Sequence, residues 1–250
     1  MTRNRLNLQV RKAIALGLVL AAGLLFYHYG RSYWTPLYYR LMGERSVAEV
    51  VATLEPTAGA AWRARCAGHG VAFPPAHITL ICIKDRRTLE VWFDGPPAVK
   101  ATEYSLTAFS GKLGPKLREG DMQIPEGTYP LTALNPNSAF HLSVRVGYPN
   151  PFDEAWAAEE GRTNLGGDIY IHGKKATIGC IAIGDAAIEE VFYLVQAVGL
   201  KNSRIIITPT DFRVEEASDS KDAPAKVREL HGAIAEALQA YSTTPMKEGV

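Results

Sequence analysis

The apolar residues of this chain form three patterns, and the first is an uninterrupted run near the N-terminus. Residues 13–26 contain no charged side chain, and four basic residues precede them: Arg3, Arg5, Arg11 and Lys12. Positive charge ahead of an apolar helix keeps that end in the cytoplasm and sends the following chain across the membrane. This pattern therefore predicts a membrane anchor or a signal segment in residues 1–30.

Three alternatives remain for this segment. It is slightly shorter than the roughly 17 residues of the shortest membrane-spanning helices, which suits a cleaved signal peptide, and a buried helix of a soluble protein would also be apolar. Tyr27, Tyr29, Tyr33 and Trp34 follow it where a signal peptide has a small-x-small cleavage site. Aromatic residues are typical of membrane interfaces and favour a retained anchor, but cleavage stays open.

The second pattern is helical and follows the apolar run. Ser46 and Glu49 have the spacing of a capping box, which predicts the start of a short amphipathic helix. Pro56 is expected to break that helix. A second helix over residues 58–66 and a linker over residues 68–75 are then expected before the main domain begins.

The third pattern begins near Ala76 and has a period of two residues, as half-buried strands do. It predicts strands over residues 77–84, 88–94, 102–109, 128–134, 140–146, 168–172 and 204–208. Three charged residues join the first two strands, which are expected to form a hairpin. Residues 110–127 are rich in glycine, proline and charge, and are expected to form an extended functional loop or a surface excursion.

Three helices are expected among these strands. One covers residues 152–160, and another begins at Asp185 as N-cap and ends at Gly199 as C-cap. After a flexible polar segment at residues 215–222, Pro224 takes the first position of a last helix, which packs back on the domain or meets a partner. We predict a mainly β chain with flanking helices, an α+β fold. Its expected parts are an N-terminal segment, a helical linker region, a main domain, and a polar linker with a C-terminal helix: residues 1–30, 31–75, 76–210 and 211–250.

Charge and cysteine content narrow this picture only slightly. The formal net charge of +1 at pH 7 gives no global signal for nucleic acid. Three cysteines are too few for a disulfide framework. Cys66 and Cys82 either form a bridge in an oxidising compartment or are two small buried hydrophobes, and Cys180 is the remaining thiol.

Residues 168–183 offer a candidate nucleophile and base. His172 ends a predicted strand, and Cys180 opens the next apolar run. A base next to a thiol activates it as a nucleophile, and the carbonyl of Gly173 is the expected group that orients the histidine ring. Because Gly179 has no side chain, a substrate carbonyl can approach the sulfur and the backbone N–H groups of Gly179 and Cys180, a candidate oxyanion hole. Alternation places His172 on the polar face of its strand, so it need not lie in the core.

These residues also have structural alternatives. A lone cysteine is often buried and inert, and His172 could simply make a hydrogen bond at a strand end. A zinc site built from His141, His172 and Cys180 has no short ligand pair such as HxxxH or CxxC to support it. We therefore expect neither a metal nor another cofactor.

The pair lies within a longer ordered set of motifs. Around it stand Ile171-His172-Gly173, Thr177-Ile178-Gly179-Cys180-Ile181-Ala182-Ile183 and Asp185. Upstream stand Gly111, Gly114-Pro115-Lys116, Gly120-Asp121, Pro125-Glu126-Gly127-Thr128-Tyr129, His141-Leu142-Ser143, Gly147-Tyr148-Pro149-Asn150 and Asp153. Over about residues 76–208, this set resembles the L,D-transpeptidase (YkuD-type) catalytic domain, in a branch with a short loop from histidine to cysteine.

The resemblance implies a β-sandwich or barrel that acts on the peptide stems of peptidoglycan. It implies that Cys180 attacks the carbonyl of the residue at stem position three and that His172 takes the thiol proton. It also implies a substrate cleft lined by six residues: His141, Lys116, Asp121, Tyr148, Asn150 and Asp153. Alternatively, His141 simply ends a strand, and the charged loop residues are simply solvated.

Two positions depart from the family pattern. Ile178 stands in place of the usual histidine, and Ala182 in place of the usual arginine. The nucleophile and the base carry over, but arginine contacts to the substrate do not. An amine that resolves the thioester makes the protein an L,D-transpeptidase. Water makes it an endopeptidase or carboxypeptidase that detaches wall-linked protein or cross-links.

Two non-enzymatic alternatives are a silent wall-binding module and an anchored scaffold whose last helix recruits a partner. The expected location is the inner membrane, with a single span and the catalytic domain in the periplasm, or the periplasm itself after cleavage. The expected partners are peptidoglycan stem peptides, wall-linked protein and the inner membrane, with no nucleic acid.

Overall fold

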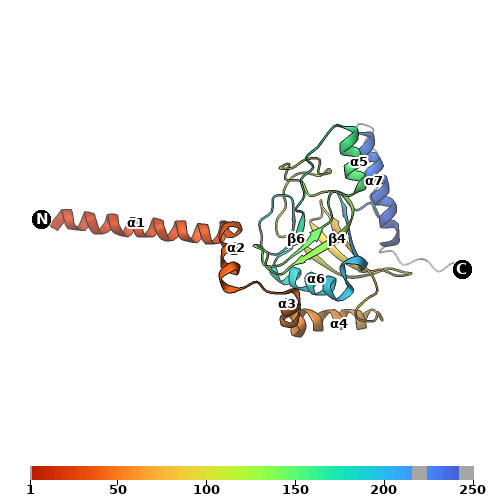
Figure 1. The fold of residues 1–250 in the computed structure, drawn as a ribbon, viewed down its shortest axis with the longest axis horizontal. Coiled ribbons are helices and arrows are strands. Elements are labelled where there is room, and N and C mark those ends of the chain that lie inside the picture. Colours follow the sequence, from red (N-terminus) through yellow and green to blue (C-terminus); the bar gives the residue numbers. More distant parts are fainter. Residues whose placement is uncertain (1, 216–223, 242–250) are drawn as a thin grey trace.

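The N-terminal helix stands apart from the rest of the molecule in a computed structural model that describes residues 2–215 and 224–241. Helix α1 (Thr2–Tyr29) projects outward, and α2 (Arg31–Met42) joins it to the domain (Figure 1). The stretch Gln9–Tyr27 is long and apolar enough to cross a membrane, and none of it is buried. The predicted apolar N-terminal helix is confirmed, although a signal sequence would have the same length and composition.

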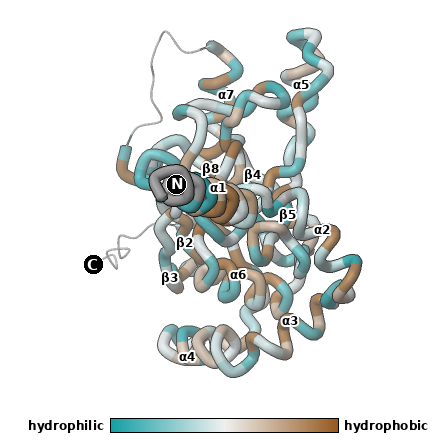
Figure 2. Tube along the Cα trace, turned by 90° about the vertical axis from the view of Figure 1, so that its left-hand side faces the viewer, coloured by the Kyte–Doolittle hydropathy of each residue, from teal (hydrophilic) through white to brown (hydrophobic). Residues whose placement is uncertain are grey.

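Figure 2 looks along α1 and shows hydrophilic residues at its outer end and hydrophobic residues nearer the domain. The candidate span Gln9–Tyr27 has 19 residues and so extends beyond the charge-free run at residues 13–26 on both sides. The helix continues without a break through these flanking residues. Its length therefore removes the objection that the segment is too short to span a bilayer.

The segment between α2 and the sheet is helical and belongs to the domain core. It comprises α3 (Val47–Leu54), a π-helical turn η1 (Glu55–Gly59) and α4 (Ala60–Gly68). Ser46 and Glu49 form the predicted capping box. α3 ends at Leu54, just before Pro56 as predicted, and the chain continues into the π-turn with the proline at its start. Trp62 and Cys66 are buried in the main core, so this region is more than a linker.

Eight strands form one curled, mixed sheet in the order β3-β2-β1-β8-β4-β5-β6-β7. They are β1 (Ile78–Ile83), β2 (Thr88–Phe93), β3 (Val99–Ser105), β4 (Gly127–Asn135), β5 (Ser143–Val146), β6 (Tyr170–His172), β7 (Ile181–Ala182) and β8 (Ser203–Thr208). The predicted β1–β2 hairpin is confirmed, and β1 runs parallel to β8. A single bridge between Ala108 and Ala182 brings the two ends of the sheet together, so the sheet curls into a barrel-like shape.

In three strands one end lies two or more residues inside the predicted range. β5 and β6 begin later than residues 140 and 168, because His141 and Asp168 have φ angles of 81° and 54°. That left-handed backbone is incompatible with a strand. β3 ends before residue 109, since the N–H of Thr107 donates to the carbonyl of Ala182 across the barrel.

Helices cover both faces of the sheet. Helix α6 (Asp185–Val198), with α3 and α4, covers one face, and α5 (Pro151–Glu159) and α7 (Ala225–Leu238) lie at the other (Figure 1). Two short 3-10 turns follow α6 and α7: η2 (Leu200–Asn202) and η3 (Gln239–Tyr241). The last helix packs back on the domain, as one predicted alternative held, and the mainly β fold with flanking helices is confirmed.

The helix caps differ in part from the prediction. Gly199 is the C-cap of α6 as predicted, but Gly184 is its N-cap and Asp185 is its first residue. The carboxylate of Asp185 accepts instead from the N–H of Lys174, so it is used outside its own helix. Pro224 is the N-cap of α7 instead of its first residue.

Cys66 and Cys82 are buried and unpaired, so the predicted alternative of a disulfide bridge is wrong and the two residues act as small hydrophobes. Beyond Glu215, the expected flexible polar segment lies outside the described residues.

Candidate functional site

His172 ends β6 and is buried, with 2% of its surface exposed. Its Nδ1 lies 2.6 Å from the carbonyl oxygen of Gly173. The ring of Phe140 lies against it, with the ring centroids 4.6 Å apart. The strand pattern left open whether the histidine is buried, and it is buried here because the loop that carries Phe140 covers it.

The contact with Gly173 fixes the tautomer of the imidazole. A carbonyl oxygen can only accept, so Nδ1 carries the proton and donates it, and Nε2 of the neutral ring holds the free lone pair. Burial lowers the pKa of His172, and the Gly173 carbonyl opposes this only in part. The ring is therefore a neutral base at neutral pH.

Cys180 lies at the start of β7, behind a tight loop. Gly179 has a φ of 127°, a conformation that L side chains rarely adopt. Thr177 closes the loop: its Oγ1 accepts from the N–H of Cys180 at 2.8 Å and donates to the carbonyl of Cys180 at 2.7 Å. The sulfur lies 3.5 Å from the carbonyl oxygen of Asp168. In this conformation the Cys180 N–H is therefore already used, and only the N–H of Gly179 remains from the predicted oxyanion pair.

Burial also sets the state of the thiol. It raises the pKa of Cys180, which the backbone N–H of Tyr170 and the ammonium of Lys116 only partly offset. Since the pKa of His172 is lowered, the resting site holds a neutral thiol and a neutral imidazole instead of an ion pair.

The sheet register brings the two residues together. β6 and β7 pair in parallel, with His172 opposite Ala182. Side chains two residues apart share a face, so Cys180 precedes Ala182 on the face of His172. Among the described residues no hydrogen bond joins the sulfur to Nε2.

The loop between β3 and β4 forms one wall of the site. A Cβ added to Gly179 would lie 3.2 Å from the carbonyl oxygen of Gln123, so the loop packs directly on the glycine. Lys116 is 6% exposed, and its Nζ donates to Asp121 at 2.7 Å. Asp121 also accepts from the N–H groups of Leu117, Arg118 and Gln123. These bonds hold the backbone of the loop in place around its carboxylate.

His141 lies beside the catalytic strand end. Its Nε2 is 2.6 Å from Oε1 of Glu189 on α6. A Cβ added to Gly173 would lie 3.2 Å from Cβ of His141 and 2.6 Å from Oδ1 of Asp185. The structure thus places His141 next to the site, with its ring held by a carboxylate.

Three residues predicted to line the cleft make contacts within the domain. Tyr148 is buried, and its hydroxyl donates to the carbonyls of Lys116 and Leu165, each at 3.3 Å. Asn150 and Asp153 form the capping box of α5. Burial raises the pKa of Asp153 to about 6. These contacts account for all three residues without a substrate.

Sequence reasoning missed the partners that come from distant segments. Phe140 covers the base and Glu189 holds His141, yet neither has a spacing that links it to the motif. Thr177 was part of the motif, but its double contact with Cys180 depends on a loop geometry that a sequence does not reveal.

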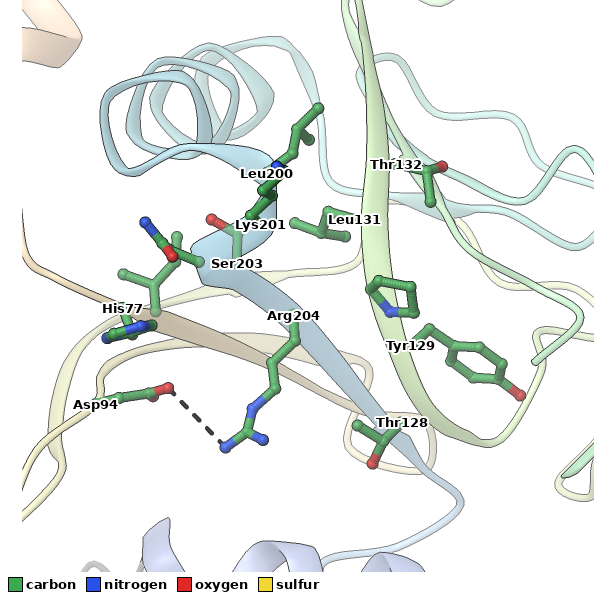
Figure 3. Close-up of a pocket in the computed structure, with 13 residues that line it drawn as sticks. His77, Asp94, Thr128, Tyr129, Leu131, Thr132, Leu200, Lys201, Ser203 and Arg204 are labelled. Carbon is green, nitrogen blue, oxygen red and sulfur yellow. Dashed lines mark ion pairs between the residues drawn. The ribbon is translucent and has the colours of Figure 1, made fainter. Parts of the chain in front are cut away.

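A cavity on the described part of the chain lies away from this site. It has a volume of about 820 Å³, opens between β1, β4 and β8, and none of the predicted site residues lines it. Figure 3 shows Arg204 and Asp94, which both line this cavity, pointing toward each other. Nη2 of Arg204 lies 4.0 Å from Oδ2 of Asp94. Within residues 2–215 and 224–241, no group of three His, Cys, Asp or Glu side chains could hold a metal ion.

Comparison with known proteins agrees with this geometry. The L,D-transpeptidase catalytic domain, YkuD, matches residues 77–211. The "Putative L,D-transpeptidase YafK" of Escherichia coli strain K12 is 32% identical over 150 residues, 58% of this chain and 57% of that protein, and its counterpart in Escherichia coli O157:H7 gives the same values. The chain thus spans somewhat more than half the length of the curated relatives it matches.

Solved structures show more distant likenesses. The helical cell shape determining protein Pgp2 from Campylobacter jejuni has 23% identity and a TM-score of 0.45, over 67% of this chain and 56% of that chain. Bd1075 from Bdellovibrio bacteriovorus has 22% identity and a TM-score of 0.40, over 67% and 57%.

The family match runs from residue 77 to residue 211 of 250 and so covers more than half of the chain. It includes every strand of the sheet, together with the histidine, the glycine and the cysteine of the site. The chain therefore belongs to the L,D-transpeptidase catalytic domain family, YkuD.

Proposed function

We propose that this protein is a membrane-anchored cysteine enzyme that transfers acyl groups of peptidoglycan stem peptides. The family and the names of the relatives support a function of the L,D-transpeptidase type. One observation carries the proposal for this chain: Nδ1 of His172 donates to the carbonyl of Gly173 at 2.6 Å, which leaves Nε2 as a base on the strand next to Cys180.

The proposed reaction starts from the neutral pair. Nε2 of His172 takes the thiol proton as the sulfur of Cys180 attacks the carbonyl of the residue at stem position three. The tetrahedral intermediate collapses when His172 returns that proton to the leaving amine, and a thioester remains on Cys180. An acceptor amine, deprotonated by His172, then attacks the thioester and regenerates the thiol.

The proposed oxyanion hole needs one rearrangement. The N–H of Gly179 is available to the developing oxyanion, whereas the N–H of Cys180 donates to Oγ1 of Thr177 in this structure. When substrate binds, the N–H of Cys180 would leave Thr177 and donate to the oxyanion instead. It would then stabilise the negative charge that forms in the transition state. Lys116, held by Asp121, adds positive charge near the sulfur, and His141 lies where it can contact the stem.

Hydrolysis is the second candidate for the fate of the thioester. Ile178 is 79% exposed next to Gly179, and Ala182 is fully buried beside His172. An apolar side chain at the rim and a methyl group in place of the family arginine remove two polar contacts that would hold an acceptor peptide. Water then competes with the amine, and the protein acts as an L,D-endopeptidase or carboxypeptidase. A non-catalytic wall-binding module is the outcome if neither reaction occurs.

The proposed location follows from the same reading. The apolar stretch Gln9–Tyr27 anchors the chain in the inner membrane, and the basic residues before it keep the N-terminus in the cytoplasm. The catalytic domain then lies in the periplasm, where peptidoglycan and wall-linked protein are accessible.

Mass spectrometry of purified stem peptides tests both the bond that is cut and the acceptor. With an added amine acceptor, the expected product carries the acceptor in place of the leaving residue, and without it the expected product is the hydrolysed stem. Equal hydrolysis with and without the acceptor would assign the protein to the peptidases. An unchanged stem in both reactions would contradict the enzymatic proposal.

The activity is expected to fall on the acid side below pH 6.5. Because burial lowers the pKa of His172, the ring stays neutral, and able to accept a proton, down to a lower pH than an exposed histidine would. Replacing Phe140 with alanine should let water reach the ring, raise this pKa and move the acid limb of the kcat/KM profile to higher pH. A profile that stays in place in Phe140→Ala would contradict this assignment of the base.

A further inference from the structure

A second pocket lies where the N-terminal helices meet the catalytic domain. Its volume is about 420 Å³, within the range of small-ligand sites. Residues of α1 and α2 form one side, and Ser138 and His141 form the other. α2 lies between the projecting α1 and the domain, so the pocket is at the base of the apolar helix (Figure 1).

Two arginines give this pocket a positive charge. Arg31 donates through Nε to the carbonyl of Ala139 at 3.2 Å, and its guanidinium lies 5.4 Å from the ring centroid of Trp34. Neither of its terminal nitrogens has a hydrogen-bond partner within the described part of the chain. Arg45 lies 5.6 Å from the ring centroid of Tyr39, and its Nη2 donates to the hydroxyl of Tyr39 and to the carbonyl of Pro136, neither of which carries a negative charge. No Asp or Glu lines the pocket. Unopposed guanidinium groups of this kind favour an anionic ligand with several acceptor oxygens.

The hydroxyl of Thr35 gives an independent sign of a ligand. Thr35 lines the pocket and is 5% exposed, yet its Oγ1 has no hydrogen-bond partner among the described residues. A buried hydroxyl is nearly always bonded, and one left without a partner calls for a specific explanation. A bound acceptor oxygen would provide the missing partner.

The position along the chain indicates which anion is available. Tyr27 is the last residue of the apolar stretch Gln9–Tyr27 and also lines the pocket. Its ring stacks on Trp34 at a centroid distance of 5.3 Å, and aromatic pairs of this kind lie at the level of lipid headgroups. If α1 spans the membrane, the pocket therefore opens at the depth of the lipid phosphates.

From these observations we infer that the pocket binds the phosphate of an anionic phospholipid headgroup. Arg31 and Arg45 would pair with the phosphate oxygens, and the hydroxyl of Thr35 would donate to one of them. The inference rests on the proposed membrane placement of α1 but not on the proposed reaction.

The bound headgroup would also steady the cover of the catalytic base. Arg31 holds the carbonyl of Ala139, and the next residue, Phe140, lies against the ring of His172. A phosphate that fixes the guanidinium of Arg31 thus fixes the segment that buries the base. Ala139, which contacts Arg31 in the pocket, and Phe140, which contacts His172, are consecutive residues and so connect the two sites through the backbone.

Native mass spectrometry of the full-length chain in detergent micelles tests the inference. The protein carries Cys180→Ala, so lipid binding is measured without any turnover and does not depend on the proposed reaction. Dioleoylphosphatidylglycerol is expected to remain bound at one molecule per chain, about tenfold more tightly than dioleoylphosphatidylcholine. Arg31→Gln should weaken this binding about tenfold, because it removes a charged hydrogen-bonding group.

Arg40→Gln is the matched control, since Arg40 is an exposed arginine of the same helix that does not line the pocket. It should change the affinity less than about twofold. Thr35→Val keeps the shape of the side chain and should weaken binding several-fold, which covers the case that Arg31→Gln disturbs the fold. Equal losses in Arg31→Gln and Arg40→Gln would overturn the inference. So would displacement of the lipid by an equal concentration of glycerol phosphate, because the ligand would then be a free phosphate.

Discussion

Replacing Cys180 with alanine is expected to abolish the turnover of stem peptides, with a loss in kcat/KM of at least about 10⁴-fold. The methyl group of alanine cannot form a thioester, and the other two cysteines, Cys66 and Cys82, are buried in the core, where a substrate does not reach them. The loss is expected at every pH and with every acceptor. Liquid chromatography with mass spectrometry of purified stem peptides measures it directly.

A second readout follows the covalent step alone. A carbapenem should add to the sulfur of Cys180 in the wild-type protein and increase the mass of the chain by that of one molecule. Cys180→Ala should show no such increase. Cys66→Ala is the matched control: Cys66 is 1% exposed on α4, so its loss affects packing and leaves both the adduct and the turnover in place. Unchanged stem processing by Cys180→Ala would exclude the thioester route.

The parts of the site that sequence predicts well are close together along the chain. His172 and Gly173 are adjacent, so the contact between Nδ1 of His172 and the carbonyl of Gly173 depends only on the local backbone conformation. Cys180 comes eight residues later, and two short parallel strands are enough to align it. The period of two residues also located seven of the eight strands, all but the two-residue β7. The remaining errors lay at strand ends, as where His141 and Asp168 adopt left-handed backbone.

The parts that sequence does not predict depend on contacts between remote segments. The N–H of Cys180 donates to Oγ1 of Thr177. The ring that lies against His172 belongs to Phe140, in the loop before β5. Polar residues in a matching stretch were expected in the cleft, yet Asn150 and Asp153 cap a helix. Residue type alone does not separate these uses, because capping and substrate binding both select short polar side chains.

The least predictable feature is a buried ionic cluster that joins three distant parts of the fold. Nζ of Lys84, just after β1, lies 2.8 Å from Oε1 of Glu126, just before β4, and both side chains are fully buried. Nε2 of His231 on α7 lies 3.0 Å from the other carboxylate oxygen. Burial alone would raise the pKa of Glu126, but the contacts with His231 and Lys84 hold it below its ordinary value.

The cluster also holds the loop that forms the wall of the active site. Nζ of Lys84 donates to the carbonyls of Gly114 at 2.7 Å and Ile124 at 2.9 Å, which lie in the middle and near the end of that loop. The N–H of Gly114 donates to Glu126. Since the same loop packs on Gly179, the cluster sets the position of the oxyanion region through the backbone.

Replacing Lys84 with methionine is therefore expected to lower the free energy of unfolding by about 3 to 5 kcal/mol, because it leaves the carboxylate of Glu126 buried without its cation. Thermal unfolding should show a decrease in Tm of about 10 °C. The deficit should shrink as the pH falls. Without the lysine, burial would raise the folded-state pKa of Glu126 above its unfolded value, so protonation at low pH favours the folded state.

The double variant Lys84→Met, Glu126→Gln removes both charges and keeps an amide oxygen that can accept from the N–H of Gly114. It should be more stable at neutral pH than Lys84→Met alone, and this advantage should shrink on acidification, because only the single variant keeps a buried carboxylate that can be protonated. If the uncompensated charge is the cause, only the single variant depends on pH in this way. A single variant within about 0.5 kcal/mol of the wild-type protein would show that the ion pair does not hold the loop. The wall over Gly179 would then have to be fixed by the other contacts of the loop, among them those of Asp121 with Lys116 and with the N–H of Gln123.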